Sequence, residues 1–303
     1  MTVTPRRRRL RRLGVFFVLM LAFGLFGIPA LCGCGTMYWL VHPGCGGDAT
    51  TPSDFGYNDW EDLAIDARAG GSFQAYFIPG DNGATIIIPP TGGAGRGSRL
   101  DLADMLARNG YAVLTYDSRR CADLGNSSLG YKEISEVEDV VDYLLAREDV
   151  DPDRIGITGF SAAGATTIMA AARRPELRAI IAEGGYGDFA EGAVGLYDGG
   201  GSFVETTYKW SLSLSYRLFT GEDIDRLSPL DVIDRIAPRP ILLIYGTKEA
   251  SLSGAYEQQA AAGDNATLWV VAGAGHGEYQ AVAPAEYEQR VIEFFDQALL
   301  GED

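Results

Sequence analysis

Histidine is scarce in this chain, and its scarcity excludes the commonest metal sites. The 303 residues include two histidines, His42 and His276, and no cysteines or histidines are spaced as in a zinc site. The Lys-Ser/Thr ending of a phosphate-binding P-loop is also missing from the one glycine-rich loop, residues 89–95. We therefore expect no metal and no other cofactor.

Cysteine is scarce as well, and four of them do not make a disulfide framework for a domain of this size. Cys32, Cys34 and Cys45 lie close together, where they can pair, be lipidated or stay reduced. Cys121 is the only cysteine in the remainder. We interpret Cys121 as a small filler of the core and not as a catalytic thiol.

Basic residues are few outside the N-terminus. The net charge is −16, and six of the 25 basic residues are arginines within residues 6–12, so the rest of the chain is more acidic still. Such a surface repels phosphate backbones, which excludes nucleic acid as an expected partner of the folded domain. The charge is typical of a soluble surface.

One long apolar run follows the arginines. Residues 13–41 carry no charged side chain and are long enough to cross a hydrocarbon layer of about 30 Å as a helix. The arginines predict a cytoplasmic segment at residues 1–12, a transmembrane signal anchor at 13–41 and an extracytoplasmic remainder. Two alternatives remain, a lipoprotein modified at Cys34 and a protein secreted after cleavage.

The remainder reads as a linker, residues 42–59, and one domain, residues 60–303. A β-hairpin is expected from Asp62–Ala67 and Ser72–Ile78, and then strands alternate with helices, which is typical of a mostly parallel sheet with helices on both faces. The further strands are expected at Ala84–Ile88, Tyr111–Tyr116, Arg154–Thr158, Arg178–Ala182, Pro240–Tyr245 and Thr267–Val271.

Three of the expected helices have clear boundaries: Ser98–Asn109, Ser135–Arg147 with Ser135 and Glu138 in capping-box spacing, and Ala285–Leu299. Residues 187–235 interrupt the alternation with glycines and aromatic residues. This insertion is either a lid over a site or an ordinary pair of helices covering the edge of the sheet.

A serine lies at a sharp turn between an expected strand and an expected helix. In Gly159-Phe-Ser-Ala-Ala-Gly164 the strand ends at Ser161 and an alanine-rich helix follows, as in a nucleophile elbow. The elbow strains the serine backbone and brings strand and helix close together, so its neighbours must be small. Gly159 and Ala163 meet this requirement, and Ser161 is the candidate nucleophile.

A serine hydroxyl needs a base and an acid that orients the base. His276, in the loop after the last strand, is the one histidine of the domain and the candidate base. Glu249 follows the preceding strand, which gives the chain order serine, acid, histidine. Asp225 and Asp264 are the fallback acids.

Acyl transfer also needs two N–H donors for an oxyanion. The N–H of Ala162, the residue after the serine, is expected to be one donor. The other is expected from the loop after the first parallel strand, where the prolines lack an N–H and Thr91 or Gly92 remains.

With these motifs assembled, the sequence from Asp62 to Leu299 resembles the α/β-hydrolase superfamily, and most closely its membrane-anchored or secreted esterase, thioesterase and peptidase-like branch. The resemblance is carried by residues 110–117, 151–161, 237–246 and 273–277. It implies Ser161 as nucleophile, Glu249 as acid and His276 as base. The sequence departs from the family at Ala163, at Pro90-Thr91 in place of His-Gly, and at residues 118–121.

The sequence therefore predicts a serine hydrolase that cleaves a carboxylic ester or related acyl bond of a small or lipid-like substrate through an acyl-enzyme. Two alternatives are kept: a peptidase or thioesterase of the same fold, and a catalytically silent hydrolase-fold domain that binds a ligand or a protein.

Overall fold

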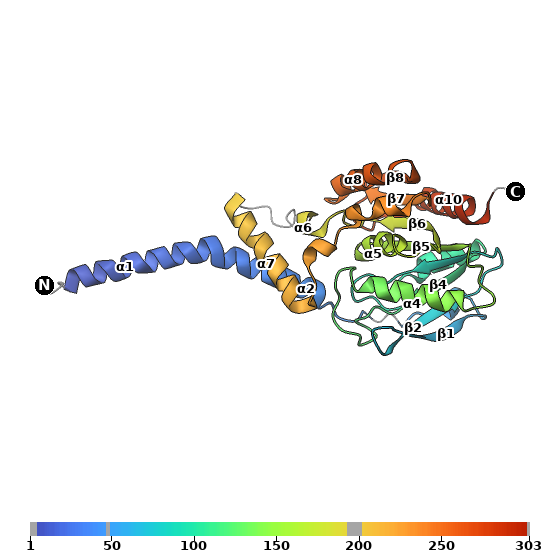
Figure 1. Cartoon of the computed structure of the whole chain (residues 1–303), viewed down its shortest axis with the longest axis horizontal. Helices are drawn as coiled ribbons and strands as arrows, with labels where there is room; N and C mark the ends of the chain where they lie inside the picture. Colours follow the sequence, from blue (N-terminus) through green and yellow to red (C-terminus); the bar gives the residue numbers. More distant parts are fainter. Residues whose placement is uncertain (1–4, 47–48, 193–201, 302–303) are drawn as a thin grey trace.

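The computed structural model describes residues 5–46, 49–192 and 202–301. They form an α/β domain and a long N-terminal helix that projects from it (Figure 1). The domain is built on an eight-stranded sheet in the order β1-β2-β4-β3-β5-β6-β7-β8. The strands are β1 Glu61–Asp66, β2 Ser72–Ile78, β3 Thr85–Ile88, β4 Ala112–Tyr116, β5 Ile155–Phe160, β6 Leu177–Glu183, β7 Ile241–Gly246 and β8 Ala266–Val271. Each lies within one or two residues of its predicted position.

The sheet is parallel from β4 to β8, and among its eight strands only β2 runs in the opposite direction. β2 pairs antiparallel with both β1 and β4, whereas β3, β5, β6, β7 and β8 follow one direction. Parallel strands are joined by helical crossovers that cover both faces. The carboxyl ends of β5, β6, β7 and β8 therefore meet at one edge, which is where sheets of this kind hold their ligands.

Helices cover both faces of the sheet, as predicted. The α-helices are α1 Pro5–Ala22, α2 Ile28–Val41, α3 Leu100–Arg108, α4 Glu133–Leu145, α5 Ala162–Ala171, α6 Phe189–Gly192, α7 Ser202–Thr220, α8 Leu252–Ala262, α9 Tyr279–Val282 and α10 Pro284–Phe295. Side chains of α4, α5 and α8 share one buried cluster with one face of the sheet, and those of α3 and α10 share another with the opposite face. Successive residues of β3 alternate between the two, since Ile87 belongs to the first cluster and Ile86 and Ile88 to the second.

The capping box predicted at Ser135 and Glu138 is wrong. Helix α4 begins at Glu133, and the Ser135 hydroxyl donates to the carbonyl of Lys132. The Glu133 carboxylate instead accepts from the preceding loop, including the N–H groups of Ser128 and Gly130 at 2.9 and 3.1 Å. These loop contacts start the helix two residues earlier than the local sequence pattern indicates.

The interpretation of Cys121 as an unpaired filler is also wrong, because Cys121 forms a disulfide with Cys45. The backbone beside this crosslink is joined to the domain as well: the Gly46 N–H donates to the Gly93 carbonyl at 2.8 Å. Residues 42–46, predicted to belong to a linker, are thus joined by the disulfide to the loop between β4 and α4 and by the hydrogen bond to the loop between β3 and α3.

The N-terminal helix is exposed over most of its length. Residues 9–41 form the one helix of the described chain that is long and apolar enough to cross a membrane, and only 6 % of its most apolar stretch is buried inside the protein. A core helix of a soluble domain would be covered by other elements. Only its last part is covered, by α7, which lies alongside α2 in Figure 1.

Candidate active site

Ser161 lies at the turn between β5 and α5, and its backbone has a conformation that residues other than glycine rarely adopt. Its φ of +58° and ψ of −124° place it outside the usual regions, and its N–H donates to the carbonyl of Glu183 on β6 at 2.8 Å. A Cβ on Gly159 would lie 2.4 Å from the carbonyl oxygen of Ala163. The close approach of strand and helix therefore requires a glycine at 159, as the sequence indicated.

Three side chains that are distant in the sequence meet at this turn. His276 Nε2 lies 3.0 Å from the Ser161 hydroxyl, and His276 Nδ1 lies 3.0 Å from Glu249 Oε2. We assign the imidazole proton to Nδ1, because a carboxylate only accepts, which leaves Nε2 free to accept the serine proton. The arrangement can deliver a proton from the serine to the imidazole.

The fallback acids lie elsewhere. Asp225 is exposed in a short 3-10 turn after α7, and Asp264 is exposed at the turn before β8. Neither is among the hydrogen-bond partners of His276 that the described residues provide. The loop after β7 therefore supplies the acid contact, and it does so through Glu249.

The environment of Glu249 keeps its carboxylate ionised. The side chain is 1 % exposed, and burial raises its pKa. Hydrogen bonds from His276, from the Tyr279 hydroxyl at 2.5 Å and from the Gly246 N–H at 2.6 Å outweigh the burial and hold the pKa below its ordinary value. The Ser251 hydroxyl donates to Glu249 Oε2 at 3.2 Å, so hydrogen-bond donors contact both oxygens of the carboxylate.

Three residues that the sequence analysis missed position the histidine. Tyr279 is buried, and burial together with its bond to Glu249 raises its pKa, so it stays a neutral donor. The ring of Phe160 lies 4.7 Å from the imidazole, centroid to centroid. Gly184 has a φ of +56°, and a Cβ there would lie 3.0 Å from the ring of His276. The one sequence signal for Gly184 is its place directly after β6.

A cavity of about 500 Å³ opens on these side chains. Ser161, Glu249 and His276 line it. The segment after β6 also lines it, with Tyr186, Phe189 and Glu191. The rings of Tyr186 and Phe189 pack edge to face, 5.1 Å apart. The cavity has room for a small acyl group and combines apolar walls with a few polar side chains, as ligand sites do.

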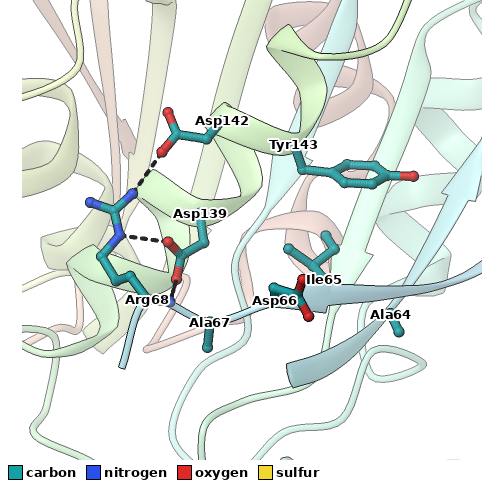
Figure 2. A pocket seen from close by; sticks show the side chains of 8 residues that line it. All are labelled: Ala64, Ile65, Asp66, Ala67, Arg68, Asp139, Asp142 and Tyr143. Atoms are coloured by element: carbon teal, nitrogen blue, oxygen red, sulfur yellow. Dashed lines mark hydrogen bonds and ion pairs between the residues drawn. The ribbon is translucent and has the colours of Figure 1, made fainter. Parts of the chain in front are cut away.

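A larger hollow of about 720 Å³ lies at the far edge of the sheet, between β1 and α4 (Figure 2). Its cation is Arg68, which is already engaged by the carboxylates of Glu138, Asp139 and Asp142. Three strands separate β1 from β5, where Ser161 lies. Of these two hollows in the described part of the chain, the smaller one is lined by a hydroxyl, an imidazole and a carboxylate in contact, so we take it as the candidate site.

The predicted oxyanion donors are only partly located. Ala162 is the first residue of α5 and adjoins Ser161. Thr91 and Gly92 follow β3, which pairs with β5 in the register Ile87 to Ile157, so their loop leaves the sheet beside the elbow. They are not among the residues that line the cavity in the described part of the chain. The second donor stays a prediction.

Comparisons with known proteins agree with this architecture. The model of a family described as X-Pro dipeptidyl-peptidase (S15 family) matches residues 50–286, which is more than half of the chain. Over 202 residues the chain is 25 % identical to YfhR, an uncharacterised protein of Escherichia coli strain K12. That match covers 63 % of this chain and 64 % of YfhR, less than two thirds of the relative's own length.

Two solved structures share the fold. The esterase Pf2001 of Pyrococcus furiosus superposes with a TM-score of 0.64 at 22 % identity, covering 85 % of this chain and 99 % of the esterase. A puromycin-hydrolysing peptidase of Mycobacterium tuberculosis has the same TM-score and identity, and the superposition covers 80 % of this chain and 40 % of that peptidase. The predicted α/β-hydrolase fold is thereby confirmed.

Proposed function

Because the chain belongs to the X-Pro dipeptidyl-peptidase (S15) family and is a hydrolase, we propose that it cleaves a carboxylic ester by a serine mechanism through Ser161, His276 and Glu249. The observation that carries this proposal is the pair of 3.0 Å contacts that joins the three side chains, with the serine on a strained elbow at the mouth of a cavity.

In the first half of the reaction, Ser161 Oγ attacks the ester carbonyl while its proton passes to His276 Nε2. Glu249 stays ionised and stabilises the imidazolium through Nδ1–H. The N–H of Ala162, with that of Thr91 or Gly92, donates to the oxyanion. As the tetrahedral intermediate collapses, the imidazolium returns its proton to the leaving alcohol, and an acyl-Ser161 remains.

In the second half, a water molecule takes the place of the alcohol. His276 accepts a proton from the water, the hydroxide attacks the acyl carbonyl, and the proton returns to Ser161 Oγ as the acid leaves. The atoms balance as one ester and one water giving one alcohol and one acid. No step needs a cofactor.

Ser161→Ala tests the proposal directly. The variant is expected to lose hydrolysis of a short-chain p-nitrophenyl ester while its unfolding transition stays that of the natural protein. A fluorophosphonate probe, which reacts covalently with an activated serine, should label the natural protein and leave the variant unlabelled. Equal labelling or equal turnover would refute the proposal, and a natural protein that binds esters without reacting would support a silent binding domain.

A peptidase is the second candidate, favoured by the family description and by the carboxylate of Glu191 in the cavity wall, which suits the free amino group of a peptide. A p-nitroanilide of an X-Pro dipeptide and a p-nitrophenyl ester, each assayed on the same preparation, separate the two. A kcat/KM higher for the anilide would replace the ester by a peptide and leave the serine mechanism in place.

For location, we propose that residues 13–41 span the membrane as an uncleaved anchor with residues 1–12 in the cytoplasm. The arginines at the start support this orientation, and the Cys45–Cys121 disulfide supports an oxidising compartment for the domain. Protease added to intact spheroplasts of a bacterial host should degrade the domain and spare a tag placed before residue 1. A tag that is lost together with an intact domain would reverse the orientation.

A further inference from the structure

Helix α7 has one buried face and one exposed apolar face. Tyr208, Leu212 and Tyr216 are no more than 2 % exposed. The opposite face carries large apolar side chains that are 42 to 72 % exposed: Phe203, Trp210, Leu214 and Leu218. Their spacing of seven, four and four residues puts them on one side of a helix. A row of exposed apolar side chains of this kind, with the charged Arg217 among them, is costly in water and indicates a partner.

The buried face of α7 packs on the N-terminal helix. Gly33 makes the close approach possible, since a Cβ there would lie 1.9 Å from the Ser211 hydroxyl. At the start of α7 the exposed face also reaches the N-terminal helix, because the rings of Phe203 and Phe26 meet edge to face, 4.5 Å apart. Small residues let helices approach closely, as in membrane helix pairs. Helix α7 lies against the N-terminal helix (Figure 1), and both helices carry exposed large apolar side chains, so we take the two exposed apolar faces as one surface.

The length of the apolar run places this contact at the membrane boundary. Residues 13–41 rise about 44 Å as a helix, which exceeds a hydrocarbon layer of about 30 Å. Counted from Leu13, that layer ends at about residue 33, which is the residue that packs closely on Ser211 of α7. Beyond residue 33 one face of the helix is covered by protein, since Met37 and Val41 are 0 % exposed, while Trp39 on another face stays exposed.

We propose that α7 is seated in the outer leaflet of the bilayer that the N-terminal helix crosses. Its exposed apolar face contacts acyl chains and headgroups, with Trp210 at their boundary, where indole rings gather. Two features favour the bilayer as occupant: the face is continuous with the membrane-spanning surface, and Trp39, 76 % exposed, lies just beyond the boundary. The proposal depends on the membrane anchoring proposed above and not on the chemistry of Ser161.

The four tryptophans make the test direct. Three variants of the full chain each keep one tryptophan, with phenylalanine at the other three positions: Trp210 on α7, Trp39 on α2, and Trp60, which packs on Tyr76 in the catalytic domain. Each is reconstituted into phosphatidylcholine vesicles with and without bromine on the acyl chains, which quenches only nearby indoles. Trp210 emission should fall by about half, Trp39 emission should fall less because Trp39 lies beyond the hydrocarbon boundary, and Trp60 emission should not change.

Any other pattern of quenching among the three variants overturns the proposal and shows which of its steps is wrong. Quenching of Trp210 by aqueous iodide alone means that α7 faces water. Protection of Trp210 from both quenchers means that protein covers it, and cross-linking then detects a second copy of the chain. Loss of quenching at Trp39 as well means that the anchoring itself is wrong. Should a triple replacement fail to fold, the natural chain and its Trp210→Phe variant give the same information by difference, and Ser161→Ala leaves all these readings unchanged.

Discussion

The hydrogen bonds around Glu249 predict the cost of replacing its carboxylate by an amide. Its two oxygens accept from four donors: Gly246 N–H and the Tyr279 hydroxyl on one, His276 Nδ1–H and the Ser251 hydroxyl on the other. In Glu249→Gln only one oxygen remains. If it stays with Gly246 and Tyr279, the new NH₂ group faces Nδ1 and forces that nitrogen to accept.

The proton of the imidazole then moves to Nε2, where it faces the Ser161 hydroxyl and blocks proton transfer. The same acid-to-amide change in serine proteases lowers kcat about 10⁴-fold. We expect a loss of about 10³- to 10⁴-fold in kcat for a p-nitrophenyl ester, equivalent to about 4 to 5 kcal/mol of transition-state stabilisation. Ester binding, read from KM, should change little.

Glu249→Asp is the matched control, because it keeps the charge and both oxygens but shortens the reach by one methylene. Its kcat should fall by about 10²-fold or less. Steady-state kinetics on the three proteins, with thermal unfolding to verify the fold, make the test. A Gln variant within tenfold of the natural enzyme, or an Asp variant worse than the Gln variant, would refute the role of the carboxylate.

Three further predictions concern stability. Gly159→Ala should lower the free energy of unfolding by about 1 to 3 kcal/mol, because its methyl group would press on Ala163, whereas Gly192→Ala, with open space around it, should have little effect in the same urea titration. Replacing both Cys45 and Cys121 by serine should lower the free energy of unfolding by up to about 4 kcal/mol, because the disulfide joins residues separated by 76 positions. An unchanged free energy of unfolding would show that the disulfide contributes nothing to stability. Because the pKa of Glu249 is lowered from 4.5 on folding, its ionised form stabilises the fold above pH 4.5, and this stability is lost as the pH falls through the lower folded value. The difference in unfolding free energy between the natural protein and Glu249→Gln should therefore shrink on acidification, and a difference that grows would contradict the assigned shift.

The sequence was informative where a local pattern has one structural solution. A serine between small residues at a strand-to-helix turn, and a histidine and an acid after the last two strands, led to three side chains that do lie in contact. The strands were found because buried parallel strands form short apolar runs between turns. These features depend on neighbours in the chain.

The features that the sequence did not reveal depend on distant residues. The pairing of Cys45 with Cys121 requires two loops to meet across 76 residues, which no local pattern records. Tyr279 looks like any aromatic residue of a loop until its hydroxyl is seen on Glu249. The sequence predicts either a lid or a pair of helices at 187–235, and residues 193–201 of this insertion lie outside the described part. The packing of α7 on the N-terminal helix was not expected at all.

The disulfide between Cys45 and Cys121 limits how far the hydrolase domain can move relative to the N-terminal helix. It lies four residues after α2, and the Arg120 side chain holds the carbonyl of Pro43 at 2.9 Å beside it. Residues 42–45 are short and are held at two points, so the opening of the candidate site keeps a fixed distance and orientation relative to the proposed bilayer. A lipid ester in that bilayer would be reached by diffusion within a plane, and its turnover should then follow its surface density more closely than its concentration in bulk.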